Sequence, residues 1–206
     1  MSAKGGRRKN LELRSISIQK HVLDNHDGSA IFSFGNVRAL ATISGPSEVR
    51  IRDELTDRST LEIHYTPLQG IPGITALAFS TALADTFSHV LLLHLHPRSL
   101  VQINLQTYAS PPTYISQPLL RREQKLRQPR VSPPHPDAPI PVSLQAAHIN
   151  AISIACLDAA IHMQSIVIAS SAVVARKGIR KNFMKGWKAG ETLVDEEEID
   201  SGGQSG

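Results

Sequence analysis

The spacing of apolar residues changes near residue 73, and this change constrains the fold more than any other feature of the chain. Upstream, short apolar runs are separated by tight-turn sequences, as in a meander of antiparallel strands. The expected strands are 13–18, 30–34, 37–44 and 61–66, with Asp27-Gly28-Ser29 and Gly35-Asn36 as turns between the first three. Gly45-Pro46 is expected to end the third strand, because proline cannot donate a hydrogen bond to a central ladder.

Downstream of this point, apolar residues recur at helical spacing, which predicts a long helix over 75–94. A strand is expected over 100–106, where apolar and polar residues alternate. A second helix is expected over 142–163 and a last strand over 166–175. This order of elements predicts an α+β fold, in which helices pack on one face of a mixed or antiparallel sheet.

Composition divides the 206 residues into one domain and three further segments. The domain is expected over 11–176. A basic segment at 1–10 and a basic-then-acidic segment at 177–206 have the composition of disordered chain. A stretch rich in proline and arginine at 109–141 is too long for an ordinary connection and is expected to be an insert.

Composition also excludes several classes of protein. The single cysteine, Cys156, rules out an internal disulfide framework and a cysteine-rich zinc site, and it favours a reducing compartment. The net charge of +4 permits contact with nucleic acid. The most apolar run is interrupted by Asp85, His89 and His94, so it is expected to be a buried helix rather than a membrane span.

Four blocks of sequence occur in a set order. They are Asp27-Gly28-Ser29-Ala30-Ile31-Phe32-Ser33-Phe34-Gly35-Asn36-Val37-Arg38-Ala39-Leu40-Ala41 followed by Ser44-Gly45-Pro46-Ser47-Glu48-Val49, Leu61-Glu62-Ile63 with Pro67 and Gly70, His96-Pro97-Arg98-Ser99 with Val101-Gln102-Ile103, and Ala146-Ala147-His148-Ile149-Asn150-Ala151 with Leu157-Asp158-Ala159. Taken together, these blocks resemble RNase PH-type domains. Within the family, the short entry before the first block and the long insert before the last are most similar to the non-catalytic, RNase PH-like subunits of the eukaryotic RNA exosome.

The resemblance implies a fold and a set of partners. The fold is the RNase PH-like (ribosomal protein S5 domain 2-like) mixed sheet with helices packed on one face. The implied partners are other RNase PH-like exosome subunits, the cap subunits of the ring, and RNA without sequence preference. The implied role is structural support for 3′–5′ RNA processing and degradation, including rRNA maturation, in the nucleus, nucleolus and cytoplasm.

The same resemblance implies further strands and a final helix at the C-terminus. Residues 178–206 carry neither pattern, so the domain is expected to be incomplete there. A shortened sheet leaves an unpaired edge and an uncovered apolar face. We therefore expect marginal stability for the isolated chain, and a cooperative, high-temperature melt in circular dichroism would contradict this expectation.

Catalysis in this family implies an arginine in a Gly-Thr-Arg setting at the start of the second helix, and acidic residues on later strands. A guanidinium holds the attacking phosphate with two hydrogen bonds, and carboxylates position a metal or act as general acid. Here the matching stretch is Ser143-Leu144-Gln145-Ala146, the acidic pair is absent, and Asp158 matches a helix aspartate with a structural role. We expect no catalytic residue, metal, cofactor or enzymatic activity. An active phosphorolytic 3′–5′ exoribonuclease is the alternative.

The candidate RNA contacts are arginines near two predicted turns, Arg50, Arg52, Arg58 and Arg98. In the ring relatives, the loop that carries the first three approaches the central channel, where arginines bind phosphates with salt-dependent affinity. The alternative is a rim of surface ion pairs with Asp53, Glu54 and Asp57. A further functional alternative is a free-standing basic RNA-binding protein that uses the 109–141 insert and the basic C-terminal run.

Two other features are candidate sites. His94 and His96 are close enough in sequence to form a metal pair, but the sequence offers no third ligand, and we expect exposed turn residues. Cys156 lies between apolar neighbours and is expected to be a small core residue.

Overall fold

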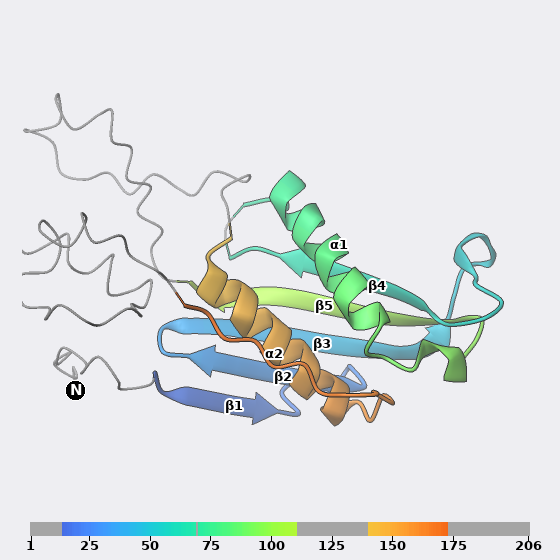
Figure 1. Cartoon of the computed structure of the whole chain (residues 1–206), viewed down its shortest axis with the longest axis horizontal. Coiled ribbons are helices and arrows are strands. Elements are labelled where there is room, and N and C mark those ends of the chain that lie inside the picture. The colour runs from blue at the N-terminus through green and yellow to red at the C-terminus, as the bar shows by residue number, and fades with distance from the viewer. Residues whose placement is uncertain (1–13, 69, 111–139, 173–206) are drawn as a thin grey trace, which may run out of the picture.

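The computed structural model describes residues 14–68, 70–110 and 140–172, which form a five-stranded sheet covered on one face by two helices (Figure 1). The predicted segments 1–10 and 177–206, most of the 109–141 insert, and the expected incompleteness at the C-terminus lie outside the described residues. The elements are β1 (Ile16–Lys20), β2 (Gly28–Phe34), β3 (Val37–Glu48), β4 (Thr60–Thr66), α1 (Ile74–Ser88), β5 (Ser99–Ala109) and α2 (Val142–Asp158), with short 3-10 turns at Ile51–Asp53 and Leu93–Leu95.

The strand order in the sheet is β1-β2-β3-β5-β4. The first three strands form an antiparallel meander, as their turn sequences predict. β5 pairs antiparallel with β3 and parallel with β4, and a parallel pair needs a crossover, which α1 supplies. The sheet is therefore mixed, and both helices lie on the same face of it (Figure 1), so the expected α+β class is confirmed.

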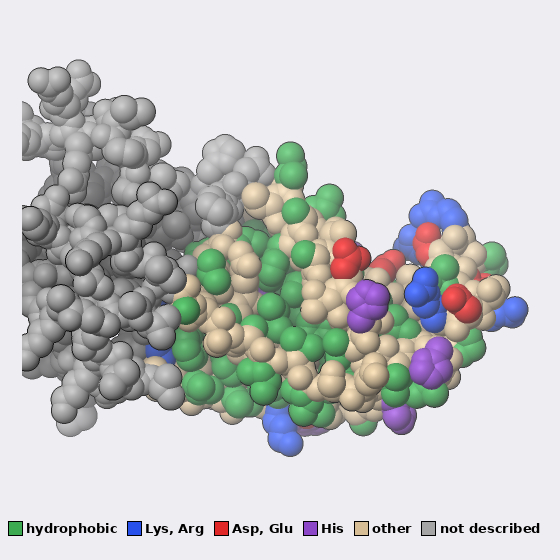
Figure 2. All heavy atoms as spheres, viewed as in Figure 1, with side chains coloured by type: hydrophobic (Ala, Val, Ile, Leu, Met, Phe, Trp, Pro, Cys, Tyr) green, Lys and Arg blue, Asp and Glu red, His purple; other side chains and the backbone are tan. Residues whose placement is uncertain are grey.

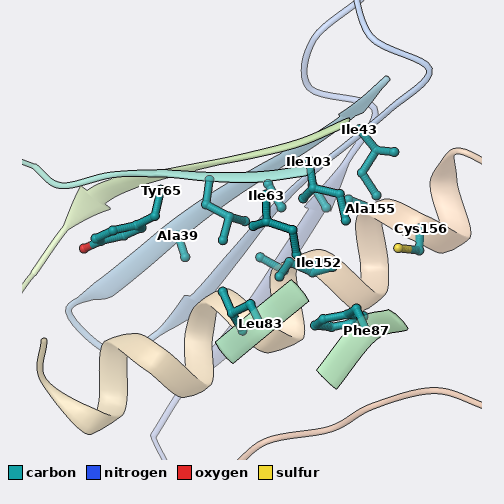
Figure 3. Packing of buried hydrophobic residues seen from close by; sticks show 14 of the residues in the cluster. Ala39, Ile43, Ile63, Tyr65, Leu83, Phe87, Ile103, Ile152, Ala155 and Cys156 are labelled. Carbon is teal, nitrogen blue, oxygen red and sulfur yellow. The ribbon is translucent and has the colours of Figure 1, made fainter. Parts of the chain in front are cut away.

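The hydrophobic core lies between the sheet and the two helices. Along β5, Val101, Ile103 and Leu105 are buried, whereas the residues between them are more exposed, because successive side chains of a strand point to opposite faces. Figure 3 shows the strand side chains Ile63 and Ile103 on the side of the sheet that faces Ile152 of α2 and Leu83 and Phe87 of α1, all within one cluster. The alternation predicted for this strand therefore decides which face of the sheet the helices cover.

Strand β2 begins where α2 ends, and the two backbones approach closely. A Cβ atom at Gly28 would lie 2.5 Å from the carbonyl oxygen of Ala155 and 2.5 Å from the amide nitrogen of Ala159. Non-bonded atoms repel strongly at this distance, so the position accepts only a residue without a side chain. Gly28 is therefore a packing residue as well as a turn residue.

The predicted end of the third strand at Gly45-Pro46 is wrong. β3 continues to Glu48, and its pairing with β5 shifts register between Ser44 and Ser47. Gly45 and Pro46 lie within this register shift and have no paired residue in β5. The missing N–H of the proline therefore breaks no hydrogen bond of the sheet. A local bulge thus allows the strand to continue through a sequence that normally ends one.

Both helices end earlier than predicted. α1 ends at Ser88 and α2 at Asp158, short of the expected bounds at 94 and 163. After α2, Ala160 adopts a left-handed conformation with φ of 53°, which is a common way for a helix to terminate. Apolar residues continue past both ends, so periodicity overestimates the helix lengths. Within the described ranges, no helix is long and apolar enough to cross a membrane.

The last predicted strand is wrong for the part that the structure describes. Residues 166–172 belong to no strand, and they run along α2 in the opposite direction. The Asn150 side chain donates to the carbonyl oxygen of Ala169 at 2.9 Å and accepts from its N–H at 2.8 Å. The Ser153 hydroxyl donates to the carbonyl oxygen of Val167 at 2.7 Å. Side chains of α2 therefore form the hydrogen bonds to the backbone of residues 167 and 169 that a neighbouring strand would form in a sheet.

Candidate functional site

The four candidate arginines lie at one end of the sheet. Arg50, Arg52 and Arg58 belong to the connection between β3 and β4. Arg98 lies at the corner before β5, and its backbone N–H donates to the carbonyl oxygen of Leu55 in that connection at 3.1 Å. The two segments are held together, so the structure brings the four residues to the same end of the molecule (Figure 1).

Acidic side chains are interleaved with these arginines. The ion pairs are Arg52 Nε with Asp53 Oδ1 at 3.4 Å, Arg98 Nε with Glu54 Oε1 at 3.2 Å, and Arg58 Nε with Asp57 Oδ2 at 3.9 Å. Figure 2 shows this mixture of basic and acidic side chains at one end of the molecule. Arg50 is exposed and forms no ion pair with any residue of the described ranges.

The ion pairs leave the guanidinium groups accessible. The side chains of Arg52, Arg58 and Arg98 are 84%, 57% and 68% exposed. Ion pairs at such exposure contribute little free energy, because water screens them. A phosphate group can compete with the neighbouring carboxylates, and binding of RNA by these arginines stays a prediction.

Gln145 lies in the first turn of α2, within the stretch that the sequence resemblance matches to the Gly-Thr-Arg setting of catalytic family members. Its side-chain Nε2 donates to the carbonyl oxygen of Ile140 at 2.9 Å. Ser143 and Leu144 beside it are buried, and the first turn of α2 carries no charged side chain. A neutral amide bound to the backbone cannot replace a guanidinium that holds phosphate with two charged hydrogen bonds.

The Asp158 carboxylate, at the end of α2, organises the turn between β1 and β2. Its Oδ2 accepts hydrogen bonds from the backbone N–H of Ser29 at 3.1 Å and of His21 at 3.2 Å. The ring nitrogen Nδ1 of His21 lies 3.6 Å from the same oxygen, and the Asp158 side chain is only 9% exposed. These contacts account for a structural aspartate at this position.

Replacing Asp158 with alanine is expected to lower the free energy of unfolding by about 2 kcal/mol, because a buried backbone N–H loses a charged acceptor. Asp158→Asn keeps one acceptor oxygen and is expected to cost about half as much. Urea unfolding followed by circular dichroism measures both values. Asp57→Ala, at an exposed aspartate, is the control and is expected to change stability by less than about 0.5 kcal/mol. Equal losses for Asp158→Ala and Asp57→Ala would exclude the structural role.

A buried polar cluster of Tyr65, Thr107 and His148 was missed in the sequence. The Thr107 hydroxyl lies 3.1 Å from His148 Nε2 and 3.2 Å from the Tyr65 hydroxyl. The His148 ring packs edge-on against Tyr65 and Phe79, with centroid distances of 5.1 and 6.2 Å. A lone histidine in an apolar helix was the only signal, and such a pattern rarely distinguishes a core residue from a ligand.

Burial keeps this cluster neutral. Desolvation lowers the pKa of His148 to about 3. Burial also raises the pKa of Tyr65, although its hydrogen bond to Thr107 opposes that shift. Because His148 is fully buried, the imidazole cannot reach a substrate, and the cluster serves the packing of α2 against the sheet.

The remaining candidates behave as ordinary surface or core residues. His94 and His96 are exposed, and the His96 ring lies 6.3 Å from that of His162. In the part of the chain that the structure describes, no group of three His, Cys, Asp or Glu side chains is placed to hold a metal ion. Cys156 is buried, as expected, and burial raises its pKa to about 12, so the thiol stays protonated.

Known proteins resemble this chain over most of its described length. The sequence model of the 3′ exoribonuclease family, domain 1 (RNase PH), matches residues 12–162. Exosome complex component rrp46 of Schizosaccharomyces pombe is 28% identical over 85 residues, which cover 41% of this chain and 38% of that protein. Exosome complex component RRP41 of Homo sapiens is 30% identical over 173 residues, which cover 78% of this chain and 58% of that protein. The chain thus spans less than two thirds of either relative.

The fold is similar to that of a solved relative. The crystal structure of Rrp46 from rice (Oryza sativa) matches with a TM-score of 0.63 and 22% identity, over 83% of this chain and 66% of that one. The sequence resemblance to RNase PH-like exosome subunits points to ribosomal RNA-processing protein 46, most of all in its fungal form, and the match to rrp46 of Schizosaccharomyces pombe agrees with it. With the mixed sheet, the two helices on one face and a family match over 12–162, the chain belongs to the RNase PH family of 3′ exoribonuclease-type domains.

Proposed function

We propose that this protein is a non-catalytic structural subunit of the RNA exosome ring. Membership of the RNase PH family and likeness to exosome components support a place in the ring. The proposed partners are other RNase PH-like subunits, the cap subunits, and RNA bound without sequence preference. The proposed role is support of 3′–5′ RNA processing and degradation, including rRNA maturation, in the nucleus, nucleolus and cytoplasm.

Gln145 is the observation that carries the non-catalytic assignment. Its amide is bonded to the Ile140 carbonyl, in the turn where phosphorolysis requires a cation. Loss of one preorganised electrostatic group typically slows an enzyme by about 10²–10³-fold. The carboxylate of Asp158 is engaged by two backbone N–H groups and offers no substitute general acid.

Reconstitution with recombinant exosome ring subunits tests the proposal. We expect one copy of the chain per ring, measured by light scattering, and no release of nucleoside diphosphates from RNA when the chain is incubated alone with inorganic phosphate. A phosphorolytic member of the family serves as the positive control. Phosphate-dependent release by the isolated chain would overturn the non-catalytic assignment, and failure to enter any ring would overturn the structural one.

Charge reversal in the β3–β4 connection tests the RNA contacts. The combined variant Arg50→Glu/Arg52→Glu/Arg58→Glu is expected to weaken RNA binding by the assembled ring. The slope of log affinity against log salt is expected to fall by about 1 for each phosphate that the loop no longer binds. Arg38→Glu is the matched control, because Arg38 is exposed at the opposite end of β3. Equal effects of the two variants would show that general charge, rather than this loop, attracts RNA.

A further inference from the structure

Helix α1 carries apolar residues on the face that points away from the sheet. Ile74 and Leu77 are 77% and 70% exposed, and Ile71, just before the helix, is 80% exposed. Ala78 and Ala82 continue the same exposed face along the helix. These five residues are named the α1 outer face, and Figure 2 shows hydrophobic side chains gathered where α1 begins.

Little on this side of α1 favours contact with water. The hydroxyl of Thr81 donates to the carbonyl oxygen of Leu77 at 3.0 Å, and that of Thr86 to the carbonyl oxygen of Ala82 at 2.9 Å, so both are bonded within the helix. Asp85 is the only charged residue of α1. The first two turns of α1 nevertheless expose Ile74, Leu77 and Ala78. A group of exposed apolar side chains of this kind marks a contact surface, so a cover over the α1 outer face is expected.

The described part of the chain ends at residue 172, on the same side of the sheet as the α1 outer face. Residues 166–172 run along α2 toward its first turns, bonded first to Ser153 and then to Asn150. In the same part of α2, the ring of His148 lies 6.2 Å from the ring of Phe79 in α1. The end of the described chain therefore lies on the helix side of the sheet, near the N-terminal halves of both helices (Figure 1).

The sequence beyond this point combines aromatic and basic residues. Phe183 and Trp187 are flanked by basic residues at 176, 177, 180, 181, 185 and 188. The ten residues 173–182 precede Phe183, and an extended chain of that length spans roughly 33 Å. The described chain ends beside the part of α2 whose His148 ring lies 6.2 Å from the ring of Phe79. Phe79 is less than two turns from Leu77 and Ile74, so Phe183 and Trp187 can reach both.

We propose that the α1 outer face is the docking site of this chain's own segment 183–187, with Phe183 and Trp187 packed against Ile74 and Leu77. Large aromatic side chains bury more apolar area than most other types, and burial of two of them on this face favours the docked state. The proposal replaces the sequence-based expectation of a solvated segment for residues 183–187.

Intrinsic fluorescence of the full chain tests this docking, because Trp187 is the only tryptophan in the sequence. We expect a blue-shifted emission maximum and weak quenching by acrylamide. Ile74→Glu and Leu77→Glu replace exposed residues with a good helix former, and each is expected to move the emission toward that of free tryptophan and to raise the quenching constant several-fold. Ile51→Glu, at an isoleucine that is 91% exposed before β4, is the matched control and is expected to change neither value.

Three other results of the fluorescence experiment would contradict the docking proposal. An emission maximum of the parent chain equal to that of free tryptophan overturns the proposal, and so does shielding that survives both helix variants. Shielding that appears only at high protein concentration overturns it in favour of a second copy as the cover. Far-UV circular dichroism of each variant separates a failure to dock from a failure to fold. None of these readouts involves ring subunits or RNA, so their failure is distinct from failure of the proposed function.

Discussion

Replacing Gly28 with alanine is expected to destabilise the domain by about 3 kcal/mol or more, the upper end of the cost of overpacking. The new methyl group would lie 2.5 Å from two backbone atoms of α2 and its C-terminal turn, and 2.6 Å from the Ala159 Cβ. Backbone atoms cannot rotate away as a side chain does, so β2 and the end of α2 must separate. The hydrogen bonds from Ser29 and His21 to Asp158 connect the same two elements and are expected to weaken with them.

Urea unfolding of the variant and the parent measures this loss. Gly70→Ala is the matched control, since no atom lies within 4 Å of a Cβ there although φ is +84°. It is expected to cost only about 1 kcal/mol, which reflects the left-handed conformation that alanine must adopt. Adding Ala159→Gly to Gly28→Ala is expected to restore little stability, because two of the three close approaches are to backbone atoms. Equal costs for Gly28→Ala and Gly70→Ala would refute the packing argument.

Acid is expected to destabilise the protein through His148 well above the pH at which carboxylates are protonated. The pKa of His148 is about 3 in the folded state, and an unfolded histidine has a pKa of about 6.5. The unfolded chain therefore binds a proton that the folded chain rejects, so stability is full above about pH 6.5 and falls as the pH decreases toward 3. Between pH 7.5 and pH 5 this linkage removes about 2 kcal/mol.

The variant His148→Leu isolates this effect. It approximately keeps the volume of the buried side chain and leaves the hydrogen bond between Tyr65 and Thr107 in place. The difference in free energy of unfolding between pH 7.5 and pH 5 is expected to shrink by about 2 kcal/mol relative to the parent. His94→Gln, at an exposed histidine, is the control. The same pH dependence in parent and His148→Leu would show that the buried imidazole does not limit stability in acid.

The fold was largely predictable because its local signals agree with its tertiary structure. The strands expected at 30–34, 61–66 and 100–106 lie within β2, β4 and β5, where turn residues bound alternating or apolar runs. The strand expected at 13–18 overlaps β1, which the structure places at Ile16–Lys20. In β4 and β5 the pattern of the segment determines which face it buries, whereas all five residues of β1 are exposed.

The wrong predictions concern segments whose secondary structure depends on residues far away along the chain. β3 continues beyond Pro46 because β5 supplies a partner on the far side of a register shift, which the sequence of β3 alone does not reveal. The apolar run after residue 165 has the composition of a strand, yet Asn150 binds its backbone and keeps it on α2. These outcomes depend on residues far away along the chain.

The candidate site was predictable only in part. Charge and position along the chain identified Arg50, Arg52, Arg58 and Arg98, and the structure places them at one end of the molecule. Their ion pairs were foreseen because most of the acids are neighbours in sequence. The Tyr65, Thr107 and His148 cluster was missed because its members come from three separate elements and carry no shared motif.

The position of β5 in the sheet has a consequence for the order of folding. β5 follows β4 in the chain, yet it lies between β3 and β4 and pairs with both. Its pairs, such as Ala39 with Thr107, join residues far apart in sequence, and folding dominated by such pairs takes milliseconds to seconds. During synthesis, β1 to β4 emerge while the place of β5 is empty, with two ladder edges open to other chains. The sheet can close only after the ribosome has released the segment that ends at Ala109, so the nascent chain is most exposed to association with other chains before that point.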